Sequence, residues 1–496
     1  MHSCYSRFHR VQFTYPGSAE PVISELSFSL GPGWTSLAGA NGCGKTTVLK
    51  LACGMLKPDS GSVDSSGTAV LCAQRTDHPP ALLNEFQNDW CGETIQLRDS
   101  LGIGDSWAER WSTLSHGERK RLQLAVALWS RPSLLAVDEP FNHLDSMGRD
   151  AVVMALSAFT GCGLLVSHDR AAMETLCTRT MLFHPGRISL YNAGYSRAVD
   201  EEEMERTRLA AAREAAKRDY LKKKRDARRK MLKARTIQAQ AGGAGVSFRD
   251  ICRLGLDGPS RIDGIVQKAG QRSREAAAKA ERARERMESI TYRKVHRTGI
   301  DLTGEPAEMN LLLDEAPGSI TVGRGSLVIP ALELLPGDRI ALTGPNGSGK
   351  STLLRWMKAR LRCPEEKLVW IPQEIAAEEA SRLLTELRGL SRDELGFIMT
   401  VVRRLGSDPE RLLDSSVPSP GETRKLLLAR GLLSDPWLIV MDEPTNHMDL
   451  PSVECLERAL DDYPGAVILV SHDRAFLNAL TERTWSIGSG ELRILV

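Results

Sequence analysis

The sequence contains no apolar run close to the ~18–20 residues that a membrane-spanning helix needs, so we expect no transmembrane segment. Its first residues lack the basic and apolar pattern of a secretion signal. The ten cysteines are scattered and form no C-x-x-C pair, which argues against a structural zinc site and against a disulfide framework. Together these absences favour a reduced, cytoplasmic setting.

Two glycine-rich segments, Gly39–Thr47 and Gly344–Thr352, fit the phosphate-loop pattern G-x-x-x-x-G-K-[ST]. Each follows a short apolar run that predicts a strand, over 34–38 or 339–343, and each opens into a helical pattern. Backbone N–H groups of such a loop surround phosphate oxygens, and the helix N-terminus adds the positive end of its dipole. The lysine reaches the outer phosphates and the next hydroxyl residue binds Mg²⁺. A chance glycine-rich turn would not be expected twice in this context.

The same parts follow each phosphate-loop lysine, so the chain contains an internal repeat of a whole domain. Asp138 and Asp442 lie 93 and 92 residues after Lys45 and Lys350, respectively. Two histidines follow at 123 and 122 residues, and two glutamines at 29 and 23 residues. The histidines are His168 and His472, and the glutamines are Gln74 and Gln373.

Each repeat carries a carboxylate pair, Asp138-Glu139 or Asp442-Glu443, directly after an apolar run. The runs 133–137 and 437–441 predict buried parallel strands, whose carboxyl ends face the ligand crevice of an α/β sheet. We expect the aspartate to hold Mg²⁺ through water and the glutamate to polarise the attacking water. A surface acidic pair is the alternative, but acids directly after five apolar residues argue against it. The histidine ends a second apolar strand. One such histidine is more often structural, but two at matched spacing favour a catalytic role.

A second candidate anion site precedes each carboxylate pair. Leu114–Glu118 reads L-S-H-G-E and Pro418–Glu422 reads P-S-P-G-E, and each opens a helical pattern. Both serines, Ser115 and Ser419, lie 23 residues before their aspartate. Ser, Gly and free N–H groups at a helix start can bind an anion. A chain that carries this turn besides a phosphate loop usually closes over ATP from two sides.

Together these motifs resemble those of the ATP-binding cassette ATPases, over roughly residues 5–195 and 305–496. Two cassettes with a charged connector between them are similar to the ABC-F subfamily, as is the stretch E-P-x-N-H-x-D after each carboxylate pair. The resemblance implies an α/β fold with two P-loop nucleotide-binding domains of the ABC type, joined by a basic α-helical hairpin. The domains are expected at 1–198, 199–300 for the hairpin, and 301–496.

In this family the cassettes face each other head to tail, which implies two composite sites for ATP and Mg²⁺. The nucleotide-binding residues of site one are then Tyr15, Gly39, Asn41, Gly42, Gly44, Lys45, Thr46, Thr47 and Gln74, closed by Ser419 and Gly421. Those of site two are Gly344, Asn346, Gly347, Gly349, Lys350, Ser351, Thr352 and Gln373, closed by Ser115 and Gly117. The implied Mg²⁺ ligands are Thr46, Gln74 and Asp138 in site one and Ser351, Gln373 and Asp442 in site two. The implied catalytic residues are Glu139, Glu443, His168 and His472.

Two departures from the family pattern predict unequal sites. Pro420 replaces a glycine in the second signature turn, and proline has no N–H to donate to phosphate. His116 makes the same replacement in the first turn but keeps its N–H. Tyr15 is placed like the family's adenine-stacking aromatic, whereas the corresponding stretch 319–331 contains no aromatic residue. We therefore expect site one to lose a phosphate donor and site two to hold its base by aliphatic contact.

The connector concentrates the positive charge of the chain. Residues 217–297 contain 24 Lys and Arg against 9 Asp and Glu, a net +15, although the whole chain carries only +2. Such asymmetry is the electrostatic pattern expected for a polyanionic partner. Residues 199–240 and 271–297 have strongly helix-forming composition, and the glycines in 241–270 predict an irregular tip. The apolar residues are too sparse for a buried core, so a solvated spacer is the alternative.

The sequence therefore predicts an ATP hydrolase that couples ATP binding and hydrolysis to ribosome binding through rRNA and tRNA, as the family resemblance implies. The role is that of a translation factor or of a ribosome-protection antibiotic-resistance protein. One rival is the ATPase subunit of an ABC transporter, which would need a separate membrane partner. The other is a DNA-associated repair ATPase, although no duplex DNA partner is expected.

Overall fold

The computed structural model describes residues 4–18, 20–142, 144–184, 187–242, 259–290, 307–323, 325–414, 418–446 and 448–495. The strands of the first half are β1 (Ser6–Phe13), β2 (Ile23–Leu30), β3 (Gly33–Gly39), β4 (Ser60–Ser65), β5 (Ala69–Cys72), β6 (Leu134–Asp138), β7 (Cys162–Val166), β8 (Cys177–His184) and β9 (Arg187–Tyr191). Its helices are α1 (Lys45–Ala52), α2 (Leu83–Asn88), α3 (Gly92–Leu101), η1 (Trp111–Thr113), α4 (His116–Trp129), α5 (Ser146–Ser157) and α6 (Arg170–Leu176).

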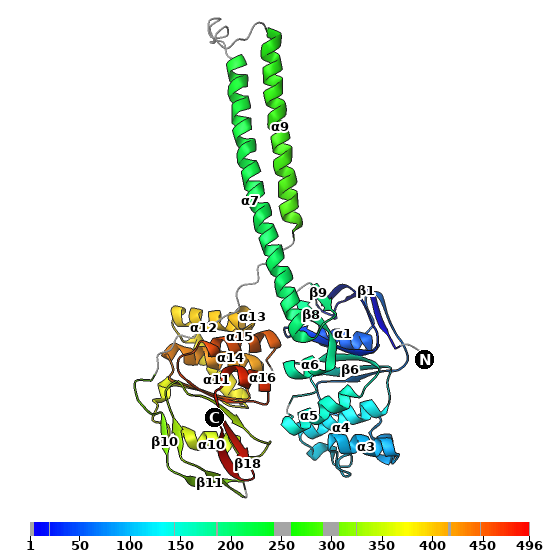
Figure 1. Ribbon diagram of the computed structural model, residues 1–496, viewed down its shortest axis with the longest axis vertical. Helices are drawn as coiled ribbons and strands as arrows, with labels where there is room; N and C mark the ends of the chain where they lie inside the picture. Colours follow the sequence, from blue (N-terminus) through cyan, green and yellow to red (C-terminus); the bar gives the residue numbers. More distant parts are fainter. Residues whose placement is uncertain are drawn as a thin grey trace. The chain divides into compact units, whose positions relative to one another are not determined.

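The second half repeats this plan (Figure 1). Its strands are β10 (Leu313–Glu315), β11 (Gly318–Val322), β12 (Gly325–Ile329), β13 (Leu332–Leu334), β14 (Arg339–Thr343), β15 (Leu368–Ile371), β16 (Leu438–Asp442), β17 (Ala466–Val470), β18 (Arg483–Gly488) and β19 (Glu491–Leu495). Its helices are α10 (Lys350–Lys358), η2 (Glu365–Lys367), α11 (Ala377–Arg388), α12 (Arg392–Arg404), α13 (Pro409–Asp414), α14 (Pro420–Gly431), η3 (Leu432–Ser434), α15 (Leu450–Asp461) and α16 (Arg474–Leu480).

The strand order of the two halves matches. The described strands of the first half are ordered β5-β6-β7-β3-β8-β9, and those of the second contain β15-β16-β17-β14-β18-β19. In both, the first five pair in parallel and the last pairs antiparallel. The strand that leads to the phosphate loop, β3 or β14, therefore lies beside the strand that leads to the histidine. The prediction of two α/β halves is confirmed.

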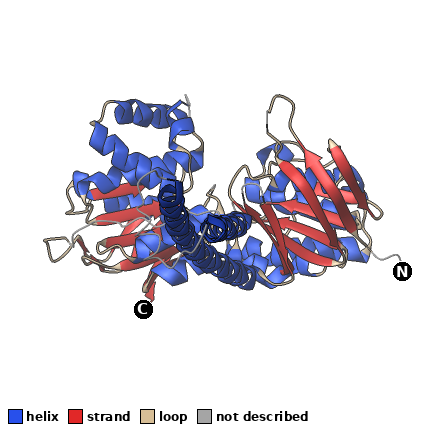
Figure 2. Cartoon of the chain, turned by 90° about the horizontal axis from the view of Figure 1, so that it is seen from above, coloured by secondary structure: helices blue, strands red, loops and turns tan. Residues whose placement is uncertain are grey.

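The sheets are buried on both faces, which explains why their strands read as continuous apolar runs. In β16, Ile439 and Met441 pack in one core cluster, and Leu438 and Val440 pack in another. Alternate residues of a strand point to opposite faces, so these clusters are the two helix-covered and strand-covered sides of the sheet. Figure 2 shows helices against the strands in each half. Because every parallel strand is fixed on both sides, the motifs at the carboxyl ends all meet at one edge.

The chain divides into two compact units, residues 1–198 with 297–496, and residues 199–296. The first unit contains both halves with their sheets. The second contains most of α7 (Tyr195–Gly242) together with α9 (Pro259–Ser289). The division into three domains at 198 and 300 remains a prediction.

The connector is a pair of long helices, as the composition predicts, but its tip is shorter than expected. Residues 259–270 were expected to be irregular, yet they form the start of α9. Proline is favoured in the first helical turn, and Gly264 and Gly270 cost roughly 1 kcal/mol each, which a long helix can absorb. Residues 243–258 of the expected tip, and 291–297 of the expected second helix, lie outside the described residues.

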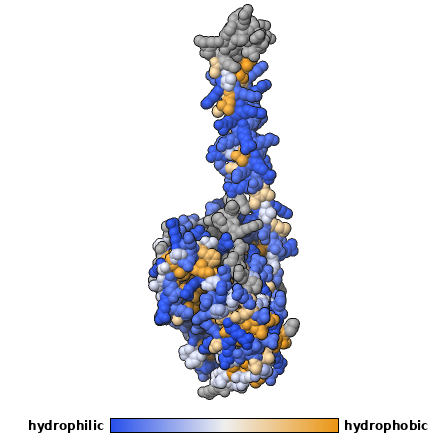
Figure 3. All heavy atoms as spheres, turned by 90° about the vertical axis from the view of Figure 1, so that its left-hand side faces the viewer, coloured by the Kyte–Doolittle hydropathy of each residue, from blue (hydrophilic) through white to orange (hydrophobic). Residues whose placement is uncertain are grey.

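The surface of these two helices is mostly hydrophilic (Figure 3). Leu221 and Leu232 are 41% and 52% exposed, as expected from the absence of a large apolar core. Small residues provide the seam instead, because Ala276, Ala280 and Ala283 of α9 are 4%, 9% and 5% exposed. These positions recur at four- and three-residue spacing, so they share one helix face.

Candidate nucleotide-binding sites

Each phosphate loop ends in a glycine that only a residue without a side chain fits well. Gly44 and Gly349 are the N-caps of α1 and α10, with φ of 100° and 102°. A Cβ on Gly44 would lie 2.9 Å from Ile23, and one on Gly349 would lie 2.8 Å from Val322. The loop therefore keeps free N–H groups at the start of a helix, which is a favourable place for phosphate.

The two lysines are held over their own loops. Lys45 Nζ donates to the carbonyl oxygens of Gly39 and Ala40, both at 2.8 Å. Lys350 Nζ donates to Gly344 at 2.7 Å and to Pro345 at 3.1 Å. Burial lowers the pKa of Lys350, although nearby carboxylates oppose that shift. Both lysines are thus positioned to exchange loop carbonyls for phosphate oxygens.

The hydroxyl residue after each lysine meets the aspartate at the end of the neighbouring buried strand. Thr46 Oγ1 donates to Asp138 Oδ2 at 2.8 Å, and Ser351 Oγ donates to Asp442 Oδ2 at 2.8 Å. Burial raises the pKa of both aspartates, and these hydrogen bonds oppose the shift. Hard oxygen donors at a phosphate site suit Mg²⁺, which keeps several waters and phosphate oxygens as its other ligands. The donors present therefore fit Mg²⁺.

The glutamate after each aspartate has a strained backbone and is buried. Glu139 and Glu443 have φ of 46° and 52°, a region that non-glycine residues enter at a cost of order 1–3 kcal/mol. Their N–H groups donate to Val166 and Val470 at 2.8 Å, the last residues of β7 and β17. The strained turn directs each glutamate toward the histidine loop of the adjacent strand.

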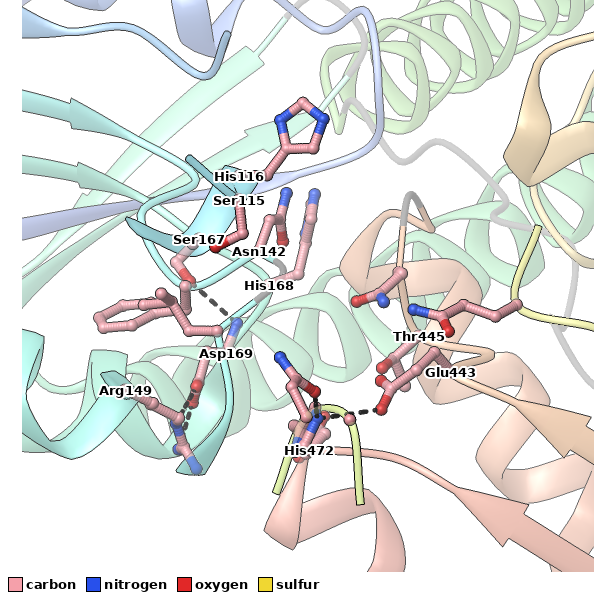
Figure 4. Close-up of a pocket in the computed structure, with 18 residues that line it drawn as sticks. Ser115, His116, Asn142, Arg149, Ser167, His168, Asp169, Glu443, Thr445 and His472 are labelled. Carbon is pink, nitrogen blue, oxygen red and sulfur yellow. Dashed lines mark hydrogen bonds and ion pairs between the residues drawn. The ribbon is translucent and has the colours of Figure 1, made fainter. Parts of the chain in front are cut away.

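The two glutamate–histidine pairs differ. His168 Nε2 lies 3.0 Å from Glu139 Oε1, whereas His472 Nε2 lies 3.5 Å from Glu443 Oε1 and 3.2 Å from Asn346 Oδ1 (Figure 4). Burial and the charge of Asp442 raise the pKa of Glu443 to about 8. Burial also opposes ionisation of Glu139, but His168 and Lys45 outweigh it and lower its pKa. Burial lowers the pKa of His472 to about 4.

Both signature turns are helix N-termini closed by a capping box. Ser115 caps α4 and accepts from the Glu118 N–H, while the Glu118 carboxylate accepts from the Ser115 N–H. Ser419 and Glu422 make the same exchange at α14. Pro420 occupies the first helical position of α14, so the turn itself is stable, but it offers one N–H fewer than the first turn.

Site one is a cavity of about 590 Å³ formed by both halves. The predicted residues that line it are Tyr15, Asn41, Gly42, Gly44, Lys45, Thr46, Thr47, Gln74, Asp138, Glu139, His168, Ser419 and Gly421. Pro420 also lines it. Gly39 is not part of the lining, although its carbonyl accepts from Lys45. The phosphate loop of one half and the signature turn of the other therefore share one cavity.

Site two is only partly brought together. A cavity of about 400 Å³ contains the predicted residues Ser115, Gly117, Asn346, Gly347, Gln373, Glu443 and His472, together with His168 of the first half. Figure 4 shows Ser115 and His116 from one half and Glu443 and His472 from the other around it. The predicted residues outside this lining are Gly344, Gly349, Lys350, Ser351, Thr352 and Asp442. Hydrogen bonds join Lys350 to Gly344, and Ser351 to Asp442.

The aromatic difference between the sites is present in the structure. Tyr15 lies at the rim of site one, with its ring edge-on to Phe13 and its Oη 3.1 Å from Thr47 Oγ1. In the second half, Ile320 and Leu327 of the corresponding strands are buried in the core. The described part of 319–331 therefore offers aliphatic surface.

Some residues that line these cavities were not among the predicted site residues. Asp449 Oδ2 accepts from the backbone N–H of Asn41 at 2.8 Å, across the two halves. Arg149 Nη2 donates to Asp169 Oδ1 at 2.7 Å, and both line the second cavity. Asp145 and Asp449 each lie seven residues after their strand-end aspartate, so the repeat itself carried this signal. His143 and His447 of the same stretch lie outside the described residues.

Comparisons with known proteins identify the family. The ABC transporter family matches residues 23–142 and 330–446. The tylosin resistance ATP-binding protein TlrC of Streptomyces fradiae is 30% identical, over 93% of this chain and 93% of its own length. The ribosome protection protein VmlR of Bacillus subtilis is 27% identical, over 90% and 80%. The energy-dependent translational throttle protein EttA of Mycobacterium tuberculosis is 25% identical, over 92% and 87%.

A solved structure agrees with the fold. The archaeal ribosome recycling factor aABCE1, in complex with the stalk protein aP1, matches with a TM-score of 0.65 and 17% identity, over 98% of this chain and 89% of that one. Within the described residues, no helix is long and apolar enough to cross a membrane. Cassettes of this kind bind ATP, typically with Mg²⁺, and support its hydrolysis. The chain belongs to the ABC-F subfamily of the ATP-binding cassette ATPases.

Proposed function

We propose that this protein hydrolyses ATP at two composite sites and uses the cycle to control its binding to ribosomes. The observation that carries the proposal is the first cavity, in which the Lys45 loop, the Asp138-Glu139 pair and Ser419 of the other half face one volume. ATP with Mg²⁺ bound there would be contacted from both halves. Closure on ATP and opening after hydrolysis then follow from the loss of the γ-phosphate that both halves contact.

In the proposed reaction the residues have separate tasks. Lys45 and Lys350 would hold the outer phosphates, and the Mg²⁺ ligands would be Thr46, Gln74 and Asp138, or Ser351, Gln373 and Asp442. Bound Mg²⁺ would neutralise charge on the phosphates. Glu139 or Glu443 would orient the attacking water, and His168 or His472 would hold that glutamate in place. Tyr15 would stack on adenine in site one.

The ribosomal partner is supported by the relatives and by the connector. The names of VmlR and EttA describe ribosome protection and translational control, and that of TlrC describes tylosin resistance. In the connector, Lys222, Lys224 and Arg225 of α7 are exposed or half-buried on a solvated helix. Some of the basic residues are already paired within the helix, for example Lys230 with Asp226 at 2.6 Å. The exposed part of the charge that forms no such pair is available for the phosphates of rRNA or tRNA.

Binding to ribosomes should require the basic connector and should fall steeply with salt. We expect replacement of 222–225 by glutamine to weaken ribosome binding about tenfold or more, because each phosphate that the protein no longer neutralises lowers the salt slope by roughly 0.7–0.9. ATPase activity without ribosomes should stay near that of the parent, since no catalytic motif lies there. The measurement is co-sedimentation with ribosomes over a salt series, in proteins trapped by Glu139→Gln and Glu443→Gln.

A matched control neutralises the same number of exposed basic residues on the two halves: Lys57, Arg355, Arg382 and Arg392. If this control weakens binding as much as the connector variant, net charge and not the connector attracts ribosomes. Stimulation of the parent ATPase by duplex DNA but not by ribosomes would favour a DNA-associated ATPase. Co-purification with a membrane protein in place of ribosomes would favour a transporter subunit. Drug susceptibility of cells with and without the protein separates a resistance role from a general translation role.

A further inference from the structure

A buried lysine connects two of the loops that carry predicted Mg²⁺ ligands in site one. Lys120, five residues after the signature serine in α4, is 3% exposed. Its Nζ donates to the carbonyl oxygen of Ala73 at 2.6 Å and to that of Asp138 at 3.3 Å. Its other partner is Gln123 Oε1 at 3.2 Å. One ammonium therefore joins the segment before Gln74 to the strand end that carries Asp138.

The second half has an arginine at the same position. Arg424, five residues after Ser419 in α14, is also 3% exposed. Its Nη2 donates to the carbonyl oxygen of Gln373, and its Nη1 donates to that of Asn446, four residues after Asp442. The side chains differ, but both connect the glutamine loop to the segment that carries or follows the aspartate.

These cations are expensive to bury. Desolvation of a charge without an ion-pair partner costs several kcal/mol, and burial lowers the pKa of both groups. Neither forms an ion pair within the part of the chain that the structure describes, and Asp138 and Glu139 act on Lys120 through longer-range attraction. An apolar residue would fill such a helix position at lower cost. The recurrence of a buried cation at the matched position of both halves points to a role in the site.

We propose that Lys120 and Arg424 are positioning residues that fix the glutamine loop relative to the strand-end aspartate in each ATP site, and so set the affinity of the site for Mg²⁺. This inference rests on the proposed ATP sites. Neither cation would contact Mg²⁺ or ATP. Each would act through backbone carbonyls of the segments that present Gln74 with Asp138, or Gln373 with Asp442. Both cations lie on the helix that the signature serine begins, so they also connect each signature turn to the Mg²⁺ ligands of its own half.

The test is Mg²⁺-dependent binding of a fluorescent ATP analogue to the full chain. A Lys350→Ala background leaves site one as the site with an intact phosphate loop, and Lys120→Met then removes the positioning charge. Loss of a group that orients metal ligands typically costs 10–100-fold in metal affinity. We expect the half-saturating Mg²⁺ concentration to rise about tenfold or more, while the analogue affinity at saturating Mg²⁺ changes by less than about threefold. Lys120→Arg, which keeps the charge and the donors, should restore the parent value.

Arg121→Met is the matched control. Arg121 is the next residue of α4, but its Nη1 donates to the carbonyl oxygens of Leu101 and Gly102, at the end of α3. It should cost stability without changing the Mg²⁺ requirement. Arg424→Met in a Lys45→Ala background tests site two in the same way. If Met at position 120 prevents folding, Lys120→Gln gives the same measurement with one short donor retained.

Equal Mg²⁺ requirements for Lys120→Met and Arg121→Met would overturn the inference and leave the proposed function intact, because the parent would still bind the nucleotide with Mg²⁺. A parent protein that binds no ATP analogue at any Mg²⁺ concentration would overturn both. A loss of analogue affinity without a change in Mg²⁺ requirement would also contradict the positioning role.

Discussion

The two ATP sites carry the same motifs but differ in how their glutamates are held. Glu139 lies 3.0 Å from His168, which favours its ionised form. Glu443 lies 3.5 Å from His472, whose Nε2 also lies 3.2 Å from Asn346, and its pKa is raised to about 8. Burial opposes ionisation of both glutamates, so the direction of each shift depends on how closely a partner compensates, because the interior screens charge poorly. Motif identity therefore does not imply equal chemistry.

The signature turns differ in the opposite sense. Site one receives Ser419, Pro420 and Gly421, and the proline has no N–H. Site two receives Ser115, His116 and Gly117, which keep all their N–H groups. Site one thus has the closer glutamate–histidine pair and the poorer set of phosphate donors, whereas site two has the reverse. Such a division would let one site retain nucleotide while the other turns over.

Removal of both glutamates should have the largest effect. Glu139→Gln with Glu443→Gln is expected to reduce steady-state ATPase activity by about 10²-fold or more, because a group that positions or deprotonates water typically contributes 10²–10⁴-fold. ATP binding should persist, since neither glutamate is expected to hold the nucleotide. Of the single variants, Glu443→Gln should reduce turnover more than Glu139→Gln, because site two keeps the fuller donor set. Steady-state phosphate release and retained radiolabelled ATP measure the two quantities.

A double variant that hydrolyses ATP at near the parent rate would refute the role assigned to both glutamates. Equal effects of the two single variants would refute the asymmetry while leaving the assignment intact. The parent in the absence of Mg²⁺ provides the inactive reference.

Exchange of the signature residues should shift the comparison by a smaller amount. Pro420→Gly adds an N–H to site one, and a hydrogen bond to a charged group is worth about 1.5–3 kcal/mol, or roughly tenfold or more in affinity. His116→Pro removes the matching donor from site two. We therefore expect Pro420→Gly to tighten ATP binding in a Lys350→Ala background and His116→Pro to weaken it in a Lys45→Ala background. If neither variant changes affinity, the missing N–H does not account for the asymmetry.

The architecture could be predicted from the sequence because the relevant signals are local. Buried strands gave continuous apolar runs, so the predicted strand 437–441 differs by one residue from β16, and 339–343 coincides with β14. Each phosphate loop, carboxylate pair and signature serine lies where the spacing placed it in its own half. The error at 259–270 arose because glycine and proline were taken as tip residues, although proline suits the start of a helix.

What the sequence could not give depends on partners that are distant in the chain. Lys120 and Arg424 read as ordinary surface charges of a helix, since their carbonyl partners Ala73 and Gln373 lie 47 and 51 residues away. The bond from the Asn41 N–H to Asp449 spans 408 residues. The positive φ of Glu139 and Glu443 and the difference between their pKa shifts also require the packed structure, because they follow from strand ends that are adjacent only in the fold.

The smallest expected effect is on stability, and it separates the two glutamates by sign. The pKa of Glu443 is raised from 4.5 to about 8 in the folded protein, so the unfolded chain loses this proton first as pH rises. Unfolding is therefore favoured progressively between about pH 4.5 and 8. Glu443→Gln removes that penalty and should raise the melting temperature of the nucleotide-free protein, by more at pH 8 than at pH 6.5. The pKa of Glu139 is lowered instead, so its contribution to stability is complete above its unfolded pKa, and Glu139→Gln should lower the melting temperature by a constant amount over the same range. Each kcal/mol corresponds to about 2–4 °C in a domain of this size. The pKa of His472 is about 4 when folded, so its own loss of stability on protonation falls mainly below pH 6.5 and does not enter the comparison. Thermal unfolding of the parent and the two variants at pH 6.5, 7.25 and 8 gives the result, and parallel curves for Glu443→Gln and the parent would show that Glu443 is already ionised in the folded protein.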